Sequence, residues 1–313
     1  MDTFDIVLCV AAICISLVIF LGNILTIFAI LTKPILQTAS NQFILGLAIA
    51  DLMVAISTPY NAYVTFELKD SDFDSYSDFA AKCLLSVVPV LFSCLSSNFN
   101  LILIAIERYF SICNPVAHRN FLTIRKARQG VGICFLLSAI AAILPVLWNN
   151  FPTNSKSSET CEVLTLKFEY YVYILLPTFI AAVLLILFAY TNIIKVALSK
   201  VANKSQAKKS LKMMMTILCC YCITWLPQMI CLFLVLYSAK SPKIDPIVSD
   251  DIYAISFMLA CCNSFMNPFI YAFNSKNFKE AFKQIIFRQK KSVQLVSNAK
   301  LTSTFSSEQM GSA

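Results

Sequence analysis

Charged residues are scarce in this chain of 313 residues: Lys, Arg, Asp and Glu make up 13% of it, and hydrophobic residues 58%. A soluble domain carries roughly 25% charged residues, so the composition excludes an ordinary soluble protein and favours a polytopic membrane protein. Glycine is also scarce, with 5 residues, which argues against a β-barrel and against glycine-rich phosphate loops. The only histidine, His118, lies in a predicted loop, so no metal cluster and no hydrolytic or redox enzyme is expected.

Long apolar stretches are what the chain has instead. They reach about 20 residues or more, the length of a membrane-spanning helix, whereas barrel strands would be about 10 residues long and alternating. The expected fold is an all-α membrane protein, a seven-transmembrane helix bundle over residues 6–273 after a short extracellular N-terminus (1–5). A short amphipathic C-terminal helix (274–290) and a disordered cytosolic tail (291–313) would follow. The expected spans are Ile6–Leu31, Asn41–Phe66, Lys82–Cys113, Ala127–Trp148, Phe168–Lys200, Ala207–Tyr237 and Asp250–Phe273.

Positive charge is distributed unevenly across this predicted membrane. The net charge is +8, and all but six of the 25 lysines and arginines lie on one side. The positive-inside rule places that side in the cytosol, which predicts a multi-pass plasma-membrane protein with its N-terminus outside and its C-terminus inside. Basic segments there suit lipid headgroups or an acidic partner, and no nucleic-acid partner is expected. The six residues on the other side are Lys69, Lys82, Lys156, Lys167, Lys240 and Lys243.

Two of the 13 cysteines stand apart from the rest, which lie mostly within the predicted helices. Cys83 is at the head of the third span and Cys161 in the loop after the fourth, both on the predicted outer side. Oxidising surroundings favour a disulfide bond between them, although position alone leaves other pairings open.

Asp51 lies near the middle of the second span, where an ionisable group is costly and therefore a functional candidate. An allosteric sodium ion, the one cofactor considered, would keep the carboxylate charged. A second interpretation is a structural acid hydrogen-bonded by Asn23 and Asn267. A third is the carrier of a transporter or ion pump, disfavoured because the sequence shows neither an internal repeat nor a second mid-membrane acid. The residues that would complete the sodium site are Ser97, Asn263, Ser264 and Asn267.

Three further segments join polar or aromatic residues to helix ends and helix breakers. Glu107-Arg108-Tyr109 ends the third span, where a snorkelling arginine is the plainer interpretation. Trp225-Leu226-Pro227 and the segment from Asn267-Pro268 to Tyr271 put prolines inside the sixth and seventh spans. Proline removes a backbone hydrogen bond and kinks a helix, so these helices are candidates for a conformational switch.

Together the motifs resemble those of rhodopsin-like (class A) G protein-coupled receptors, in the family's order and over Gly22 to Phe287. Locally, Trp148-Asn-Asn150 and Asn263-Ser264 are similar to the adenosine-receptor-like members. The resemblance implies a cell-surface receptor that binds a small extracellular ligand and activates heterotrimeric G proteins by rearranging its helices. A non-signalling decoy receptor is the alternative. The implied switch residues are Asn23, Asp51, Glu107, Arg108, Tyr109, Tyr190, Trp225, Pro227, Asn267, Pro268 and Tyr271.

The resemblance also implies a ligand pocket in the outer half of the bundle. Val90 stands where aminergic members place an Asp, which disfavours a cationic amine. Leu232 and Val163 replace the Asn and Phe with which adenosine receptors read and stack the nucleobase, which disfavours adenosine. The expected ligand is small and largely uncharged or lipid-like. The implied lining is Asn61, Val90, Leu91, Cys94, Val163, Ile174, Thr178, Trp225, Gln228, Met229, Leu232, Tyr253 and Phe257.

Several positions depart from the family pattern. Asn98 and Tyr221 replace an apolar residue and a Phe of the core switch, and Ala182 replaces a proline of the fifth helix. Ala207 stands where many members have a Glu that holds the arginine of the third helix, so ligand-free signalling is expected. Hydroxyl groups in the tail are expected to be phosphorylated by a receptor kinase and capped by arrestin: Thr302, Ser303, Thr304, Ser306 and Ser307.

Overall fold

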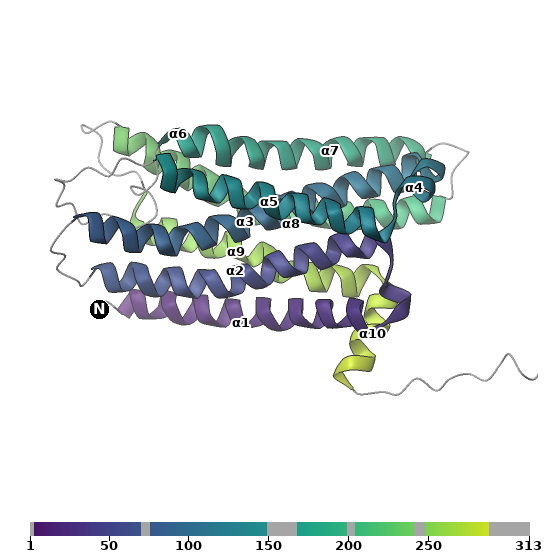
Figure 1. Cartoon of the computed structure of the whole chain (residues 1–313), viewed down its shortest axis with the longest axis horizontal. Coiled ribbons are helices and arrows are strands. Elements are labelled where there is room, and N and C mark those ends of the chain that lie inside the picture. Colours follow the sequence, from purple (N-terminus) through teal and green to yellow (C-terminus); the bar gives the residue numbers. More distant parts are fainter. Residues whose placement is uncertain (1–2, 70–75, 149–167, 199–203, 241–247, 288–313) are drawn as a thin grey trace, which may run out of the picture.

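The computed structural model describes residues 3–69, 76–148, 168–198, 204–240 and 248–287. Within these ranges every regular element is helical, and the long helices form one elongated bundle (Figure 1). Seven stretches are long and apolar enough to cross a membrane, which confirms the predicted fold class. The long helices are α1 (Thr3–Thr32), α2 (Ala39–Lys69), α3 (Tyr76–Cys113), α5 (Ile124–Trp148), α7 (Leu176–Leu198), α8 (Lys204–Lys240) and α9 (Asp250–Asn274).

Four of the sequence-based predictions concern positions outside this description. Cys161 and Val163 fall between α5 and α6, and the hydroxyl-bearing tail, Thr302 to Ser307, falls after the last helix. The side chain of Ala207 is likewise not described.

The bundle buries polar side chains within its apolar core and exposes many large apolar side chains on its outside. α2 and α3 lie at its centre, with α1, α5 and α7 around them (Figure 1). Leu21 of α1, Leu136 of α5 and Leu184 of α7 are each at least 60% exposed, whereas Asn23 and Asp51 are fully buried. This reversal of the soluble pattern fits a lipid surround, in which polar side chains pair with one another between helices.

The predicted loop after the third span contains a helix, α4 (Pro115–Phe121). Pro115 occupies the first turn, where its missing N–H costs nothing and its fixed φ favours a helical start. His118 therefore lies on a helix, and its predicted place in a loop is wrong. A short 3-10 helix, η1 (Pro34–Leu36), likewise begins with a proline between α1 and α2.

The fifth span is interrupted near its start. It comprises α6 (Phe168–Tyr170), the π-helical turn η2 (Tyr171–Leu175) and α7. Pro177 lies two residues after the π turn. Its ring lacks an N–H and crowds the preceding turn, and such a defect is relieved by a local change of helical register. The residues of η2 therefore face directions that a regular α-helix would not give them.

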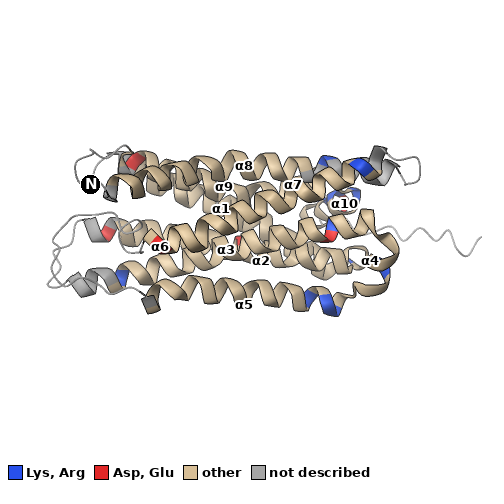
Figure 2. Cartoon of the chain, turned by 90° about the horizontal axis from the view of Figure 1, so that it is seen from above, with Lys and Arg blue, Asp and Glu red and all other residues tan. Residues whose placement is uncertain are grey.

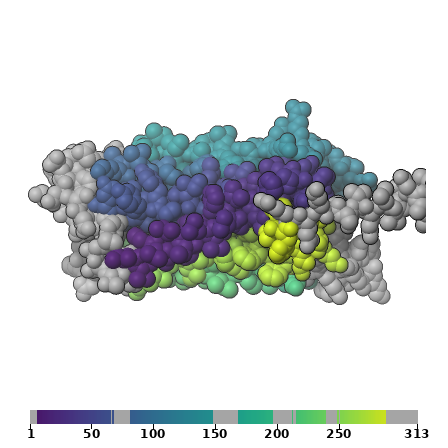
Figure 3. Space-filling view, turned by 90° about the horizontal axis from the view of Figure 1, so that it is seen from below, coloured from purple at the N-terminus to yellow at the C-terminus, as the bar shows by residue number. Residues whose placement is uncertain are grey.

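The amphipathic helix predicted after the seventh span is α10 (Lys276–Ile286). The Ser275 hydroxyl accepts the Phe278 N–H at its start, and the buried rings of Phe278 and Phe282 face the bundle. α10 contacts α9, α1 and η1, turns across the bundle axis in Figure 1 and lies beside α1 in Figure 3. Its remaining surface carries Lys276 and Lys279, which are exposed.

Lysine and arginine gather at one end of the bundle. Figure 2 shows most of the blue ribbon where α4 and α10 lie. This end is called the basic end below, and the other, where α6 lies, the outer end. The described cations of the basic end include Arg119, Arg125, Lys126, Arg128 and Lys276.

A close approach of three helices depends on Gly46 of α2. A Cβ atom there would lie 2.6 Å from Asn100 Oδ1 of α3 and 2.6 Å from a methyl group of Val131 on α5. We expect Gly46→Ala to lower the thermal unfolding midpoint of the purified protein in detergent, because overpacking a buried contact costs about 1–3 kcal/mol.

Gly132→Ala is the matched control, since a Cβ atom at Gly132 would meet nothing within 4 Å. Alanine replaces a poor helix former there, so this midpoint should stay unchanged or rise. If both variants lowered the unfolding midpoint equally, the close packing at Gly46 would not explain the loss of stability.

Candidate functional site

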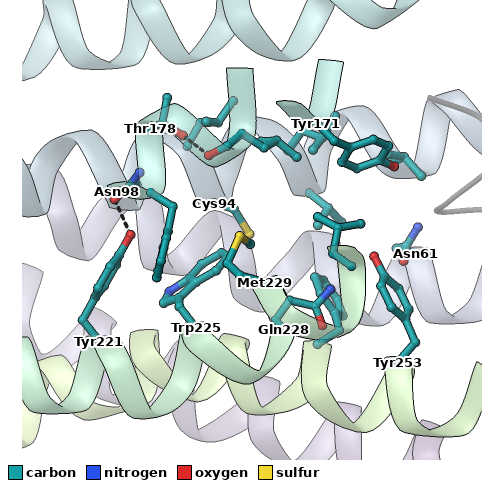
Figure 4. A pocket seen from close by; sticks show the side chains of 18 residues that line it. Asn61, Cys94, Asn98, Tyr171, Thr178, Tyr221, Trp225, Gln228, Met229 and Tyr253 are labelled. Carbon is teal, nitrogen blue, oxygen red and sulfur yellow. Dashed lines mark hydrogen bonds between the residues drawn. The ribbon is translucent and has the colours of Figure 1, made fainter. Parts of the chain in front are cut away.

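A cavity of about 100 Å³ opens between α2, α3, η2, α7, α8 and α9, towards the outer end (Figure 4). All the lining residues implied by the resemblance lie on it except two: Val163, which is not described, and Ile174. The implied residues on the cavity are Asn61, Val90, Leu91, Cys94, Thr178, Trp225, Gln228, Met229, Leu232, Tyr253 and Phe257.

Ile174 was wrongly placed on the cavity wall. It packs into the apolar cluster beside it, whereas Tyr171 and Leu175 of the π turn line the cavity. Pro177 indicates a disturbed helix here, but the sequence alone does not give the resulting register. Four other lining residues missed by the prediction had a signal, because each lies three or four positions from a predicted one on the same helix: Val87, Leu95, Asn98 and Tyr221. Phe179, the residue after Thr178, had no such signal.

The described lining of the cavity contains no charged side chain. Two of its amides already have partners: Asn61 donates to the Ser86 hydroxyl (3.1 Å), and Gln228 accepts from the Ser256 hydroxyl. The Trp225 indole N–H is buried and makes no hydrogen bond within the described chain. A buried donor without an acceptor is costly, so Trp225, a residue of the cavity wall, carries one unpaired donor.

A hydrogen bond between two helices forms the floor of the cavity. The Tyr221 hydroxyl of α8 donates to Asn98 Oδ1 of α3 over 2.8 Å (Figure 4). The Tyr221 ring stacks on Phe179 of α7, with 5.4 Å between centroids, and lies 6.2 Å from the Trp225 ring. Ala182 of α7 is fully buried in the same cluster, and its side chain is a single methyl group. The two departures noted in the sequence, Asn98 and Tyr221, are thus partners.

Asp51 is the centre of a second polar cluster. Its Oδ1 accepts hydrogen bonds from Ser97 (2.9 Å) and Ser264 (2.7 Å), and its Oδ2 accepts one from Asn267 (2.7 Å). These side chains are all buried and come from α2, α3 and α9. Of the residues expected here, Asn263 is buried nearby on α9 but makes no hydrogen bond to Asp51.

Asn23 does not bond Asp51, contrary to one expectation. Its amide donates to the carbonyl oxygens of Ile19 (2.9 Å) and Ser264 (3.2 Å), so it joins α1 to the backbone of α9. Beside it, a Cβ atom on Gly22 would lie 3.0 Å from the buried Pro268 ring. The predicted pair Gly22-Asn23 therefore sets how closely α1 approaches the proline of α9.

Glu107 holds a third cluster, at the basic end. Its Oε1 accepts from Ser40 of α2 (2.6 Å) and lies 2.9 Å from His118 Nε2 of α4. Arg108 Nε lies 3.3 Å from Glu107 Oε2, close enough for an ion pair but not aligned as a hydrogen bond. The Glu107 carboxylate therefore contacts three side chains, those of Ser40, His118 and Arg108. Within the described chain it is the one acid paired with Arg108.

Of the remaining predicted switch residues, Tyr109, Tyr190 and Tyr271 lie towards the basic ends of their helices. The Tyr109 ring contacts Phe188 of α7, with 5.4 Å between centroids, and Tyr190 is half-buried on the same helix. Tyr271 is buried at the end of α9, its ring 5.6 Å from Phe278 of α10. Pro227 lies within α8. At the outer end Cys83 is buried and disulfide-bonded.

Comparison with known proteins agrees with this geometry. The family described as "7 transmembrane receptor (rhodopsin family)" matches residues 22–271. "Adenosine receptor A3" of Canis lupus familiaris is 26% identical over 287 residues, covering 86% of this chain and 87% of that protein. The Bos taurus "Adenosine receptor A3" is 27% identical over 289 residues, 87% of each. The Rattus norvegicus "5-hydroxytryptamine receptor 4" is 26% identical over 304 residues, 85% of this chain and 72% of that protein.

The chain therefore belongs to the rhodopsin family of seven-transmembrane receptors, the G protein-coupled receptors of class A, and is related to adenosine receptors. The family predicted from the sequence motifs is confirmed.

The bond between Asn98 and Tyr221 can be measured with a double-mutant cycle. Tyr221→Phe and Asn98→Leu each leave a buried polar partner unpaired, so each should lower the unfolding midpoint, by an amount equivalent to about 1–3 kcal/mol. The double variant leaves neither group unpaired. Its loss of unfolding free energy should be smaller than the sum of the two single losses by about 1 kcal/mol. Strictly additive losses would show that the two side chains are not coupled.

Proposed function

We propose that the chain is a plasma-membrane receptor that binds a small, uncharged extracellular ligand at its outer cavity and activates a heterotrimeric G protein at its basic end. The hydrogen bond that forms the floor of the cavity carries the proposal, because it joins the ligand cavity directly to two of the long helices. The excess of lysine and arginine at the basic end supports a cytosolic location for it, with the outer end and the N-terminus outside.

The chemistry of the cavity supports an uncharged ligand. The relatives named above are adenosine and 5-hydroxytryptamine receptors, yet Val90 and Leu232 stand on the cavity wall where a charge or an amide would select those compounds. A cationic ligand would lose its hydration without gaining a counterion. A largely apolar molecule fits this wall, and a hydrogen-bond acceptor on it would pair with the buried Trp225 N–H once the ring moves.

The switch that we propose begins at the floor of the cavity. A ligand shifts a conformational equilibrium only if it binds one state better than the other. A ligand that contacts Trp225 would displace the neighbouring Tyr221 and weaken its bond to Asn98, which frees α8 from α3. Arg108, held only by Glu107 of its own helix within the described chain, would then be available to the G protein. The arrangement favours measurable signalling without ligand.

A transporter or pump based on Asp51 receives less support. All three described hydrogen bonds to Asp51 come from neutral side chains, and the residue does not line the outer cavity. A decoy receptor is disfavoured because the chain keeps three residues of the implied switch, Arg108, Trp225 and Tyr271. They lie in the same bundle as the polar contacts described above.

An allosteric sodium ion suits the Asp51 cluster. One carboxylate and the hydroxyl oxygens of Ser97 and Ser264 already converge on one point, and such oxygens are the ligands that hard cations take. Asn263 and Asn267 would complete the surroundings. The ion would supply the positive charge that a buried carboxylate otherwise lacks, and it would favour the conformation in which α2, α3 and α9 stay together.

At the cytosolic end we further propose a receptor kinase and arrestin as partners. The segment Thr302 to Ser307 offers hydroxyl groups, and each phosphate adds roughly −1.5 to −2 charge.

The signalling proposal is tested by G protein nucleotide exchange. Receptor reconstituted in vesicles without ligand should accelerate exchange by a panel of heterotrimeric G proteins above the rate of empty vesicles. Arg108→Ala should return the rate to that background, because it removes the charge that the partner would contact. Lys276→Ala, which removes an exposed charge of α10 at the same end, should leave the rate unchanged. If the Arg108 variant were as active as the wild type, the proposed switch would be wrong.

The sodium proposal is tested by thermal stability. In NaCl the wild type should unfold at a higher temperature than in N-methylglucamine chloride of equal ionic strength, by the equivalent of about 1.4 kcal/mol when sodium is at ten times its dissociation constant. Asp51→Asn keeps the size of the side chain and removes its charge, so the two salts should become equivalent. The same sodium effect in Asp51→Asn would place the ion elsewhere.

A further inference from the structure

We propose that a second cavity, at the basic end, binds one anionic phospholipid of the cytosolic leaflet, with an acyl chain inside the cavity and the headgroup at Lys126. This proposal uses the orientation proposed above but not the signalling activity. The cavity lies between α2, α3, α4 and α5 and has a volume of about 320 Å³.

The wall of this cavity suits a hydrocarbon chain. It is formed largely by apolar side chains, among them Leu103 and Phe110 of α3 and Phe121 of α4. Ile106 and Phe110, near the end of the membrane-crossing helix α3, are 36% and 44% exposed, and Phe121 of the adjoining α4 is 68% exposed. Apolar side chains at this level face lipid, so an acyl chain of the inner leaflet reaches the opening without crossing water. Burying its methylene groups against this wall is favourable.

The one acid of the wall would not repel an anion. Glu107 is buried, accepts from Ser40, contacts His118 and pairs with Arg108. Its charge is therefore compensated within the protein, which leaves Lys126 as the cation of the described lining.

The edge of the cavity is positively charged, and its cations have no counterion among the described residues. Lys126 is exposed, lies on the wall, and has its Nζ 5.6 Å from the centre of the Phe121 ring. Arg119 of α4 and Arg125 of α5 are also exposed. None of the three forms an ion pair with any described acid. An apolar cavity with a cationic edge matches an anionic headgroup joined to an acyl chain, and the cytosolic leaflet is where such lipids concentrate.

Binding there would act on the end of α3 that carries Arg108. Glu107 and His118 both line the cavity, and their contact is the polar link between α3 and α4. A lipid that fills the space beside this contact would hold α4 against α3. The proposal therefore assigns α4, a helix that the sequence did not predict, a role in lipid recognition.

Lipid retention by the purified receptor tests the proposal without any ligand or G protein. In native mass spectrometry with added palmitoyl-oleoyl phosphatidylserine or phosphatidylcholine, the wild type should retain the serine lipid in preference. Lys126→Gln should weaken that retention roughly fivefold, the equivalent of about 1 kcal/mol for one lysine near an anionic surface. Lys279→Gln, an exposed lysine of α10 at the same end, is the control and should retain the lipid as the wild type does.

A filling variant and a soluble competitor separate the acyl chain from the headgroup. Ala117→Phe puts a ring into the cavity and should reduce retention while the unfolding midpoint of the receptor stays near that of the wild type. Glycerophosphoserine, the headgroup without its chains, should not displace the lipid. The proposal is wrong if the two lipids are retained equally, if Lys126→Gln behaves like the control, or if the soluble headgroup competes as well as the lipid.

Discussion

Inside a membrane there is no water to pair with a buried polar group, so each such group needs a hydrogen-bond partner within the protein. This constraint determines how the helices of the bundle are arranged. Asp51 meets it with three hydrogen bonds from two other helices, which fix α2, α3 and α9 in one arrangement. Asn23 joins α1 to the backbone of α9 in the same region. The central helices are therefore joined by polar contacts, and the surrounding helices can present nearly pure hydrocarbon to the membrane.

α8 is held in a different way. It packs mainly against α7 and α9 and touches α3 at few places. Its polar links are the bond from Tyr221 to Asn98 and the bond from Ser256 to Gln228, both beside the outer cavity. A ligand in that cavity lies next to the bonds that position α8, whereas the Asp51 cluster lies away from the cavity wall. This division between a fixed centre and one loosely held helix is what makes a switch physically reasonable here.

Much of the fold could be predicted from the sequence, because a membrane span needs a long apolar stretch whatever its neighbours are. The ends of α5 and α9 and the start of the fifth span were placed closely for this reason. α4 was missed because a seven-residue helix has no such length requirement. The π turn before Pro177 was missed because the register of the helix there depends on packing as well as on the proline. The changed register places Ile174 off the cavity wall.

The residues of the candidate site were predictable where the position of a single residue on its helix decides whether it faces the cavity. Positions such as Cys94 and Gln228 followed from the family motifs and lie on the cavity. Pairings between helices were harder. The sequence marked Asn98 and Tyr221 as separate departures, and only the structure shows that one bonds the other. The suggested bond from Asn23 to Asp51 was wrong because the backbone carbonyl of Ser264 takes that amide.

The most direct test of this account is the distance between the basic ends of α5 and α8, measured by electron paramagnetic resonance with genetically encoded spin labels at Arg125 and Lys212, both exposed. Without ligand, Tyr221→Phe should shift the distance distribution towards longer values than in the wild type, because α8 loses its bond to α3. Tyr237→Phe, at an exposed tyrosine of the same helix, should leave the distribution unchanged. An unchanged distribution in Tyr221→Phe, or an equal shift in both variants, would contradict the claim that this bond holds α8 in place.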